Sequence, residues 1–152
     1  MIRILTIFLL FICDIITKQW VFNSIDLNNF VSVTFFLDLT HIHNFGISFG
    51  LFSGLVSSWF LIFISLFVTG LIFYMMMKAK NTMEKLGLLI IIAGALSNIF
   101  DRAMNGYVID FIYLHYKDFY WPAFNFADIY ISIGVFIVML QLLKDLHKRL
   151  IK

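Results

Sequence analysis

Four long apolar segments dominate this sequence and restrict the folds open to it. They cover about residues 4–22, 55–77, 84–103 and 124–143, and an α-helix needs about 20 mostly apolar residues to cross a bilayer. Hydrophobic residues make up 62% of the 152 residues and charged residues only 13%, whereas soluble domains carry about 25% charged residues. We therefore expect a single all-α membrane domain over residues 1–152 with four transmembrane helices.

The connections after the first and third apolar segments contain strand-like runs. Residues 31–37 are V-S-V-T-F-F-L and residues 107–113 are Y-V-I-D-F-I-Y, both rich in β-branched and aromatic side chains. The first run predicts a small β-rich element between the first two helices. The formal charge is only +2 and the basic residues are scattered, so the sequence does not predict nucleic-acid binding.

Basic residues predict the orientation of the helices. Eight of the eleven lysines and arginines flank the ends of the helices that would face one side of the membrane, and they are Arg3, Lys78, Lys80, Lys85, Lys144, Lys148, Arg149 and Lys152. Because lysine and arginine accumulate in cytoplasmic loops, both termini are predicted to be cytoplasmic. Both longer connections, including the β-rich element, then face outward.

Polar residues of the predicted spans gather near the outer surface. This layer contains Asp14, Lys18, Asn98, Asp101, Arg102, Asn125 and Asp128. Charges inside a membrane are costly, about 2.5–3.5 kcal/mol each on insertion scales, and they usually mark function. Asp14 and Lys18 are one helical turn apart and can pair. Pairing that only holds helices together would still leave two or three carboxylates without a basic partner.

Surplus carboxylates in a partly dry site predict acid–base chemistry. Two close aspartates share a proton, so that one can activate water while the other protonates the leaving amine. The residues therefore predict an intramembrane aspartyl protease, with Asp14, Asp101, Asp110 and Asp128 as candidates that spacing does not separate. Depth favours Asp101 as the partner of Asp128. The neighbours of Asp110 favour it as the partner instead, because it lies between the apolar residues Ile109 and Phe111, where burial should raise its pKa.

Five motifs in order resemble those of the lipoprotein signal peptidases, also called signal peptidase II. They are D-I-I-T-K at 14–18, N-F-G-I-S-F-G at 44–50, A-G-A-L-S-N-I-F-D-R at 93–102, V-I-D-F at 108–111 and F-N-F-A-D at 124–128. The resemblance covers essentially the whole chain. In the third motif Ala93 and Ser97 stand where the family often has glycine, and both are small enough for close helix packing.

The resemblance implies a role for each polar residue. Asp110 and Asp128 would be the catalytic dyad, and the supporting or substrate-binding residues would be Asp14, Lys18, Asn44, Asn98, Asp101, Arg102 and Asn125. The substrates would be diacylglyceryl-modified prolipoproteins, cut before the lipidated cysteine next to membrane lipid, with no metal or cofactor. Globomycin-type inhibitors would bind. The protein would lie in the bacterial cytoplasmic (inner) membrane, with the active site near the outer face.

Alternatives remain at this stage. A non-enzymatic proton-coupled carrier or channel subunit would also use intramembrane carboxylates, although it would need polar groups across the whole membrane thickness. A serine–lysine dyad of Ser48 and Lys18 is conceivable. His41 and His43 alternate along a strand-like segment, and hydrogen bonding is the simpler expectation for them than metal binding.

Overall fold

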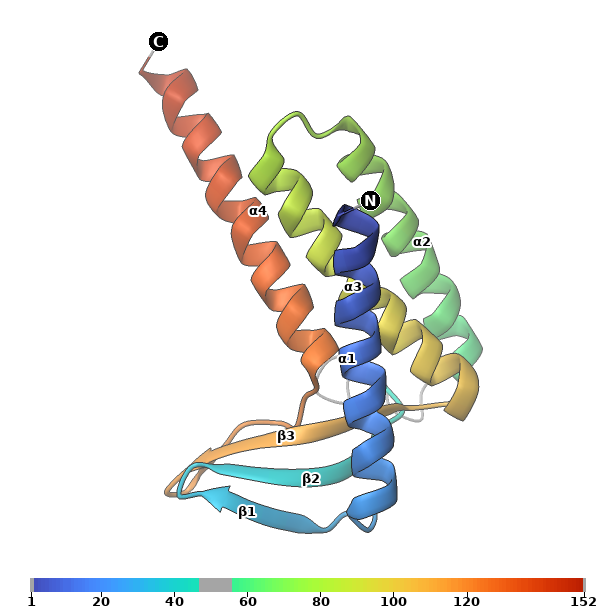
Figure 1. The fold of residues 1–152 in the computed structure, drawn as a ribbon. Helices are drawn as coiled ribbons and strands as arrows, with labels where there is room; N and C mark the ends of the chain where they lie inside the picture. Colours follow the sequence, from blue (N-terminus) through green and yellow to red (C-terminus); the bar gives the residue numbers. More distant parts are fainter. Residues whose placement is uncertain (1, 47–55, 152) are drawn as a thin grey trace.

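The computed structural model describes residues 2–46 and 56–151. This part of the chain forms four long helices and four strands (Figure 1). Their order is α1 (Ile2–Ser24), β1 (Phe30–Thr34), β2 (Leu37–Asn44), α2 (Ser58–Lys78), α3 (Thr82–Asn105), β3 (Val108–Tyr116), β4 (Phe119–Tyr120) and α4 (Phe126–Leu150). The predicted fold class, a four-helix membrane protein with a small β-element between the first two helices, is confirmed.

All four helices are long and apolar enough to cross a membrane. Their bounds differ from the predicted spans mostly at the C-terminal end, where α4 continues to Leu150 instead of ending near residue 143. The extension, residues 144–150, is K-D-L-H-K-R-L, in which good helix formers such as lysine, leucine and arginine continue the helix after the purely apolar run has ended. Both chain termini lie at the end of the bundle opposite the sheet (Figure 1).

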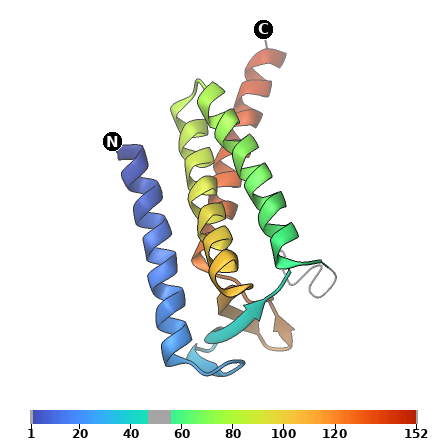
Figure 2. The same ribbon diagram turned by 90° about the vertical axis from the view of Figure 1, so that its right-hand side faces the viewer.

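Helix α3 lies at the centre of the bundle (Figure 2). Half of its apolar window is buried, against 11–17% for the other three helices. Small residues allow close packing against α4, since a Cβ added to Gly134 would lie 2.5 Å from the carbonyl oxygen of Gly87. Contact this close requires glycine on both helices.

The ends of α3 are well defined by capping residues. Asn81 caps its start by accepting a hydrogen bond from the Met83 amide at 2.7 Å. Gly106 ends the helix in the left-handed conformation, at φ 81°, which glycine adopts without a Cβ penalty. The Ser58 hydroxyl donates to the Gly106 carbonyl at 2.5 Å, so the start of α2 is fixed beside the turn that leads into β3.

The four strands form one antiparallel sheet in the order β1-β2-β3-β4. The prediction of a strand at 107–113 is confirmed by β3, although this strand follows α3 and so adds the second connection to the sheet. The prediction of one strand over 31–37 is wrong, because a turn at Phe35 and Phe36 divides it between β1 and β2. The Thr34 hydroxyl accepts a bond from the Phe36 amide there, which stabilises the turn.

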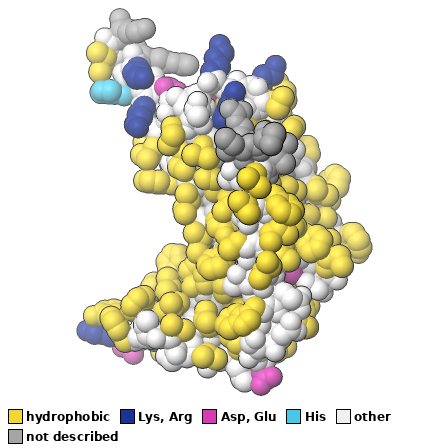
Figure 3. Space-filling view, viewed as in Figure 1, with side chains coloured by type: hydrophobic (Ala, Val, Ile, Leu, Met, Phe, Trp, Pro, Cys, Tyr) yellow, Lys and Arg dark blue, Asp and Glu magenta, His cyan; other side chains and the backbone are white. Residues whose placement is uncertain are grey.

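A small buried cluster joins the sheet to the end of α1. Val21 of the helix and Ile25, the residue after its end, pack against Ile109 and Phe111 of β3. The sheet therefore lies across one end of the bundle. The space-filling view shows a largely apolar surface around the helices, with lysine and arginine gathered at the end opposite the sheet (Figure 3).

Candidate active site

Two aspartates from different elements line the same clefts at the sheet end of the helices. Asp110 comes from β3 and Asp128 from the first turn of α4. One cleft, of about 470 Å³, lies between α4 and the segment after β4, on the face that is hollowed in Figure 3. The other, of about 260 Å³, is bounded by α2, α3 and α4. Both clefts are lined by Asn44, Asp110 and Asp128.

Asn125 connects the two aspartates and is itself fully buried. Its side-chain amide donates to Asp110 Oδ1 at 2.7 Å, and its backbone N–H donates to Asp128 Oδ2 at 3.2 Å. Its side-chain oxygen accepts from the Asp128 amide at 3.0 Å. This is a capping box at the start of α4. The residue that caps the helix therefore also fixes both carboxylates.

The surroundings of Asp110 favour its protonated form. The carboxyl is only 3% exposed. Burial, followed by repulsion from Asp128, raises the pKa of Asp110 to about 7, while hydrogen bonds from Asn44 and Asn125 and the charge of Lys18 act in the opposite direction. The Asn44 amide donates to Asp110 Oδ2 at 2.9 Å. The expectation that burial raises this pKa is confirmed.

Asp128 receives its second side-chain contact from α3. The Asn98 amide nitrogen donates to Asp128 Oδ1 at 2.9 Å. On its other side, the Asn98 carbonyl oxygen accepts from Lys18 Nζ at 2.8 Å. Lys18 forms an ion pair with Asp14 at 2.8 Å and approaches Asp101 at 3.4 Å, which confirms the predicted Asp14–Lys18 pair.

Asp14 and Asp101 are occupied by structural contacts. Asp14 accepts hydrogen bonds from the Ser97 hydroxyl at 2.6 Å and from the Ala127 amide at 3.0 Å. Asp101 accepts from the Ile109 amide at 2.8 Å and from Asn105 at 2.6 Å. Neither is among the described residues that line the two clefts. The preference for Asp101 that depth alone suggested therefore has no geometric support.

Arg102 is buried at the edge of the second cleft. Its guanidinium donates to the Gly46 carbonyl at 2.6 Å, and so it holds the backbone two residues after Asn44. Ser97, which the sequence indicated only as a small packing residue, also supports the site through its hydrogen bond to Asp14. Ser97 lies one helical turn before Asp101, and that spacing on a polar helix face was the available signal.

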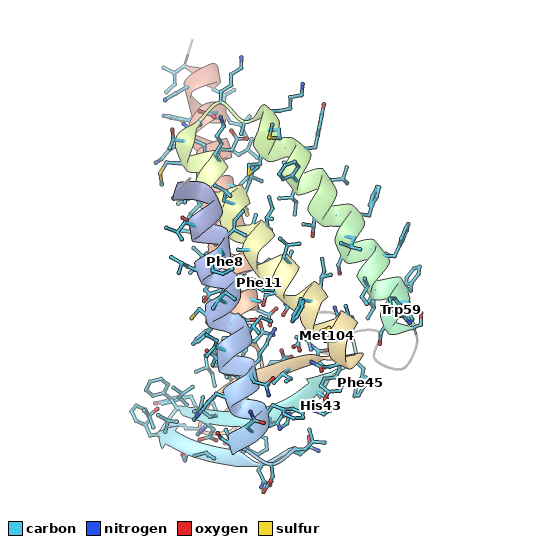
Figure 4. The ribbon with its side chains drawn as sticks, turned by 45° about the vertical axis from the view of Figure 1, so that its right-hand side comes forward. Phe8, Phe11, His43, Phe45, Trp59 and Met104 are labelled. Carbon is cyan, nitrogen blue, oxygen red and sulfur yellow. The ribbon has the colours of Figure 1, made fainter. Side chains whose placement is uncertain are left out.

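The two predicted hydrogen-bonding histidines contact each other beside the site. Their Nε2 atoms are 3.1 Å apart, and His41 Nδ1 lies 2.9 Å from the Ile25 carbonyl. His43 stacks on Tyr107 at 3.6 Å, and Figure 4 shows it beside Phe45 below the end of α3. Burial, with a smaller effect of His41, lowers the pKa of His43. Ser48, the alternative nucleophile, lies outside the described residues.

Fold and site together define a multi-span membrane protein with a carboxylate-lined cleft at one end of its helices. The family model described as signal peptidase (SPase) II matches residues 6–144. The chain therefore belongs to the signal peptidase II family and is a bacterial multi-pass membrane peptidase.

Several known proteins are similar to this chain over most of its length. A lipoprotein signal peptidase of Thermodesulfovibrio yellowstonii is 44% identical over 140 residues, covering 92% of this chain and 93% of the relative. One of Pseudoalteromonas atlantica is 36% identical, covering 89% and 85%. A bacterial membrane enzyme solved by the in meso method at 2.3 Å resolution is 30% identical with a TM-score of 0.86, covering 94% of this chain and 88% of the other.

Proposed function

We propose that this protein is an intramembrane aspartyl endopeptidase that removes signal peptides from diacylglyceryl-modified prolipoproteins, cutting before the lipidated cysteine. The observation that carries the proposal is that Asp110 and Asp128 line a shared cleft and receive hydrogen bonds from one buried residue, Asn125. Membership of the signal peptidase II family supports the substrate class.

The dyad supplies both functions that peptide hydrolysis needs. One carboxylate accepts a proton from water, and the resulting hydroxide attacks the scissile carbonyl carbon. The other carboxyl, still protonated, donates a hydrogen bond to the carbonyl oxygen. A proton then passes to the leaving amine as the C–N bond breaks. The pKa of Asp110 near 7 supports this role, because the pair then retains one proton at neutral pH.

The linings of the clefts suit an apolar, membrane-embedded substrate. Ile129, Ile131 and Ile133 line the first cleft beside the dyad. Ile64, Val68 and Ile72 line the second at successive turns of α2, so this cleft extends along the helix axis away from the sheet. Apolar walls that converge on a few polar groups are typical of ligand sites. A signal peptide and acyl chains have the matching chemistry.

The charge distribution supports the placement of the site at the outer face of the cytoplasmic (inner) membrane. The end of α2, the start of α3 and the end of α4 lie opposite the sheet (Figure 1), and these segments and the α2–α3 connection carry Lys78, Lys80, Lys85, Lys144 and Lys148. Positive residues accumulate on the cytoplasmic side, so the dyad would face outward. Globomycin-type inhibitors would compete for the same clefts.

Substitution of either aspartate tests the dyad. Asp110→Asn and Asp128→Asn should each abolish cleavage of a diacylglyceryl-modified prolipoprotein in detergent, because an amide can neither accept the proton from water nor supply one to the leaving amine. Asp118→Asn, on the exposed turn after β3, is the matched control and should cleave normally. Thermal unfolding would show that each variant is folded. Processing of the lipidated precursor by either dyad variant would refute the assignment.

A further inference from the structure

Lys18 is a buried cation that lies behind the dyad without lining either cleft. Its side chain is 2% exposed. The residues that it contacts also form hydrogen bonds to Asp128 or to backbone groups next to the two aspartates. We propose that Lys18 is a positioning residue that sets the placement of Asp128 relative to Asp110. The inference rests on the dyad proposed above.

The first connection runs from Lys18 to Asp128 through Asn98. Lys18 Nζ donates to the carbonyl oxygen of Asn98 at 2.8 Å, and the amide nitrogen of the same side chain donates to Asp128 Oδ1 at 2.9 Å. Successive hydrogen bonds polarise one another. The ammonium therefore fixes which end of the Asn98 amide faces Asp128 and strengthens the bond that it donates.

The second connection runs from Lys18 to the strand that carries Asp110. Lys18 Nζ lies 3.4 Å from Asp101 Oδ2. The same carboxylate oxygen accepts the backbone N–H of Ile109 at 2.8 Å, one residue before Asp110. The position of the strand at the catalytic residue thus depends on a carboxylate that Lys18 holds.

The third connection passes through Asp14 to the start of α4. Lys18 pairs with Asp14 Oδ2 at 2.8 Å, while Asp14 Oδ1 accepts the Ala127 amide at 3.0 Å. Ala127 directly precedes Asp128, and a carboxylate at a helix N-terminus is favourable. Lys18 is therefore joined to α3, to β3 and to α4 at residues that contact or adjoin the dyad.

Helix packing alone does not require this charge. Buried ion pairs are often replaced by well-packed apolar residues with no loss of stability, and Val21, the next buried position of α1 after Lys18, is apolar. The connections to both aspartates supply the functional reason. The positive charge also lowers the pKa of Asp110, against the effects of burial and of Asp128.

The charged and titratable groups around this lysine come from every element packed against it. They are Asp14 on α1, Asp101 and Arg102 on α3, Asp110 on β3 and Asp128 on α4, with His43 and Tyr107 near Asp101. Removing the ammonium leaves one more uncompensated negative charge near the dyad. We therefore expect the pKa of Asp110 to rise when the ammonium is removed.

Lys18→Met tests the inference because methionine has a similar length and no charge. The rate of cleavage at saturating lipidated precursor should fall about 10–100-fold per folded enzyme, as for other outer-shell changes, while KM stays within about twofold. The alkaline limb of the pH profile of kcat/KM, where Asp110 loses its proton, should move to higher pH. Lys80→Met, at an exposed position remote from the sheet, is the matched control and should change neither quantity.

The double variant Asp14→Asn/Lys18→Met addresses the case in which the single variant does not fold, since it removes both members of the ion pair. It should show the same fall in kcat but a smaller shift of the alkaline limb to higher pH, because the charge of Asp14 is removed together with the ammonium. A wild-type kcat and pH profile in whichever variant folds, or the failure of both to fold, would overturn the proposal in favour of a purely structural role. Retained cleavage by Asp110→Asn or Asp128→Asn would instead refute the dyad itself.

Discussion

Replacing Gly94 with alanine tests whether the fit between α3 and α4 positions the dyad. A Cβ on Gly94 would press on the carbonyl oxygen of Ala127, the residue before Asp128. The similar contact of Gly134 shows the size of the problem, because a Cβ there would lie 2.5 Å from the Gly87 carbonyl oxygen. Ordinary van der Waals contact begins at 3.4 Å, so the two helices would have to move apart by about 0.9 Å at that point. The Gly94 Cβ would be closer still to its oxygen, so the start of α4 must move by about 1 Å in a packed interior.

A displacement of this size predicts a large loss of activity and a small loss of stability. Misplacing a catalytic group by about 1 Å can lower the rate about 100-fold, which corresponds to 2 × 1.36, or about 2.7 kcal/mol, in the barrier. Overpacking lowers the free energy of unfolding by about 1–3 kcal/mol. The higher helix propensity of alanine offsets about 1 kcal/mol, so Gly94→Ala should lose only about 0–2 kcal/mol of stability.

The assay measures the initial rate of cleavage of a lipidated prolipoprotein per folded enzyme, and thermal unfolding in the same detergent measures stability. Two other glycines provide the controls. Gly70→Ala meets no heavy atom within 4 Å and should behave as the wild type. Gly134→Ala creates a comparable clash six residues beyond Asp128, about 9 Å further along the helix, and should be destabilised yet active. The reasoning fails if Gly94→Ala cleaves at the wild-type rate, or if Gly134→Ala loses as much activity.

Three further predictions concern Asn125 and Asp110. Asn125→Ala and Asn81→Ala each remove a helix cap and should lose about 1 kcal/mol of stability, but only Asn125→Ala should lose most of its cleavage activity; equal activity of the two would contradict the role of Asn125 at the dyad. The cleavage rate should fall as pH rises through about 7, where Asp110 loses its proton. A cleavage rate that does not change between pH 6 and pH 9 would exclude a shared proton. A carboxyl whose folded pKa is raised contributes stability that is present below its unfolded pKa and lost as pH rises through its folded pKa. Asp110→Asn should therefore raise the unfolding temperature at pH 8 more than at pH 4, and a pH-independent difference would show that Asp110 titrates normally.

The helices were predictable because each depends on a local property, a run of about 20 apolar residues. The strand at 107–113 was predictable because it also depends on a local property, a short run of β-branched and aromatic residues. The turn at Phe35 and Phe36 was not, because neither residue is typical of turns. It joins β1 to β2, which pair directly across it, while β2 also pairs with the distant strand β3. Pairing partners from distant parts of the chain are not encoded in a local run.

Within the site, residues on one helix were easier to predict than contacts between helices. The Asp14–Lys18 pair follows from their spacing of four residues. The same spacing says nothing about Asn98 or Asp101, which lie about 80 residues away in sequence and reach Lys18 only through packing. The choice between Asp101 and Asp110 was open on spacing alone because the folded position of β3 decides it.

The return of the chain from β4 to α4 separates the β3–β4 hairpin from Asp110 and Asp128. Phe124 pairs with Ile112 through two backbone hydrogen bonds, of 2.8 and 3.0 Å, and so brings Asn125 beside Asp110 before α4 begins. This bridge closes a loop whose tip, near Lys117, lies beyond it. Residues can be inserted into or deleted from that tip without lengthening the path between the aspartates. The β3–β4 hairpin is therefore a place where related enzymes can differ in length and sequence without a change in the relative position of the two aspartates.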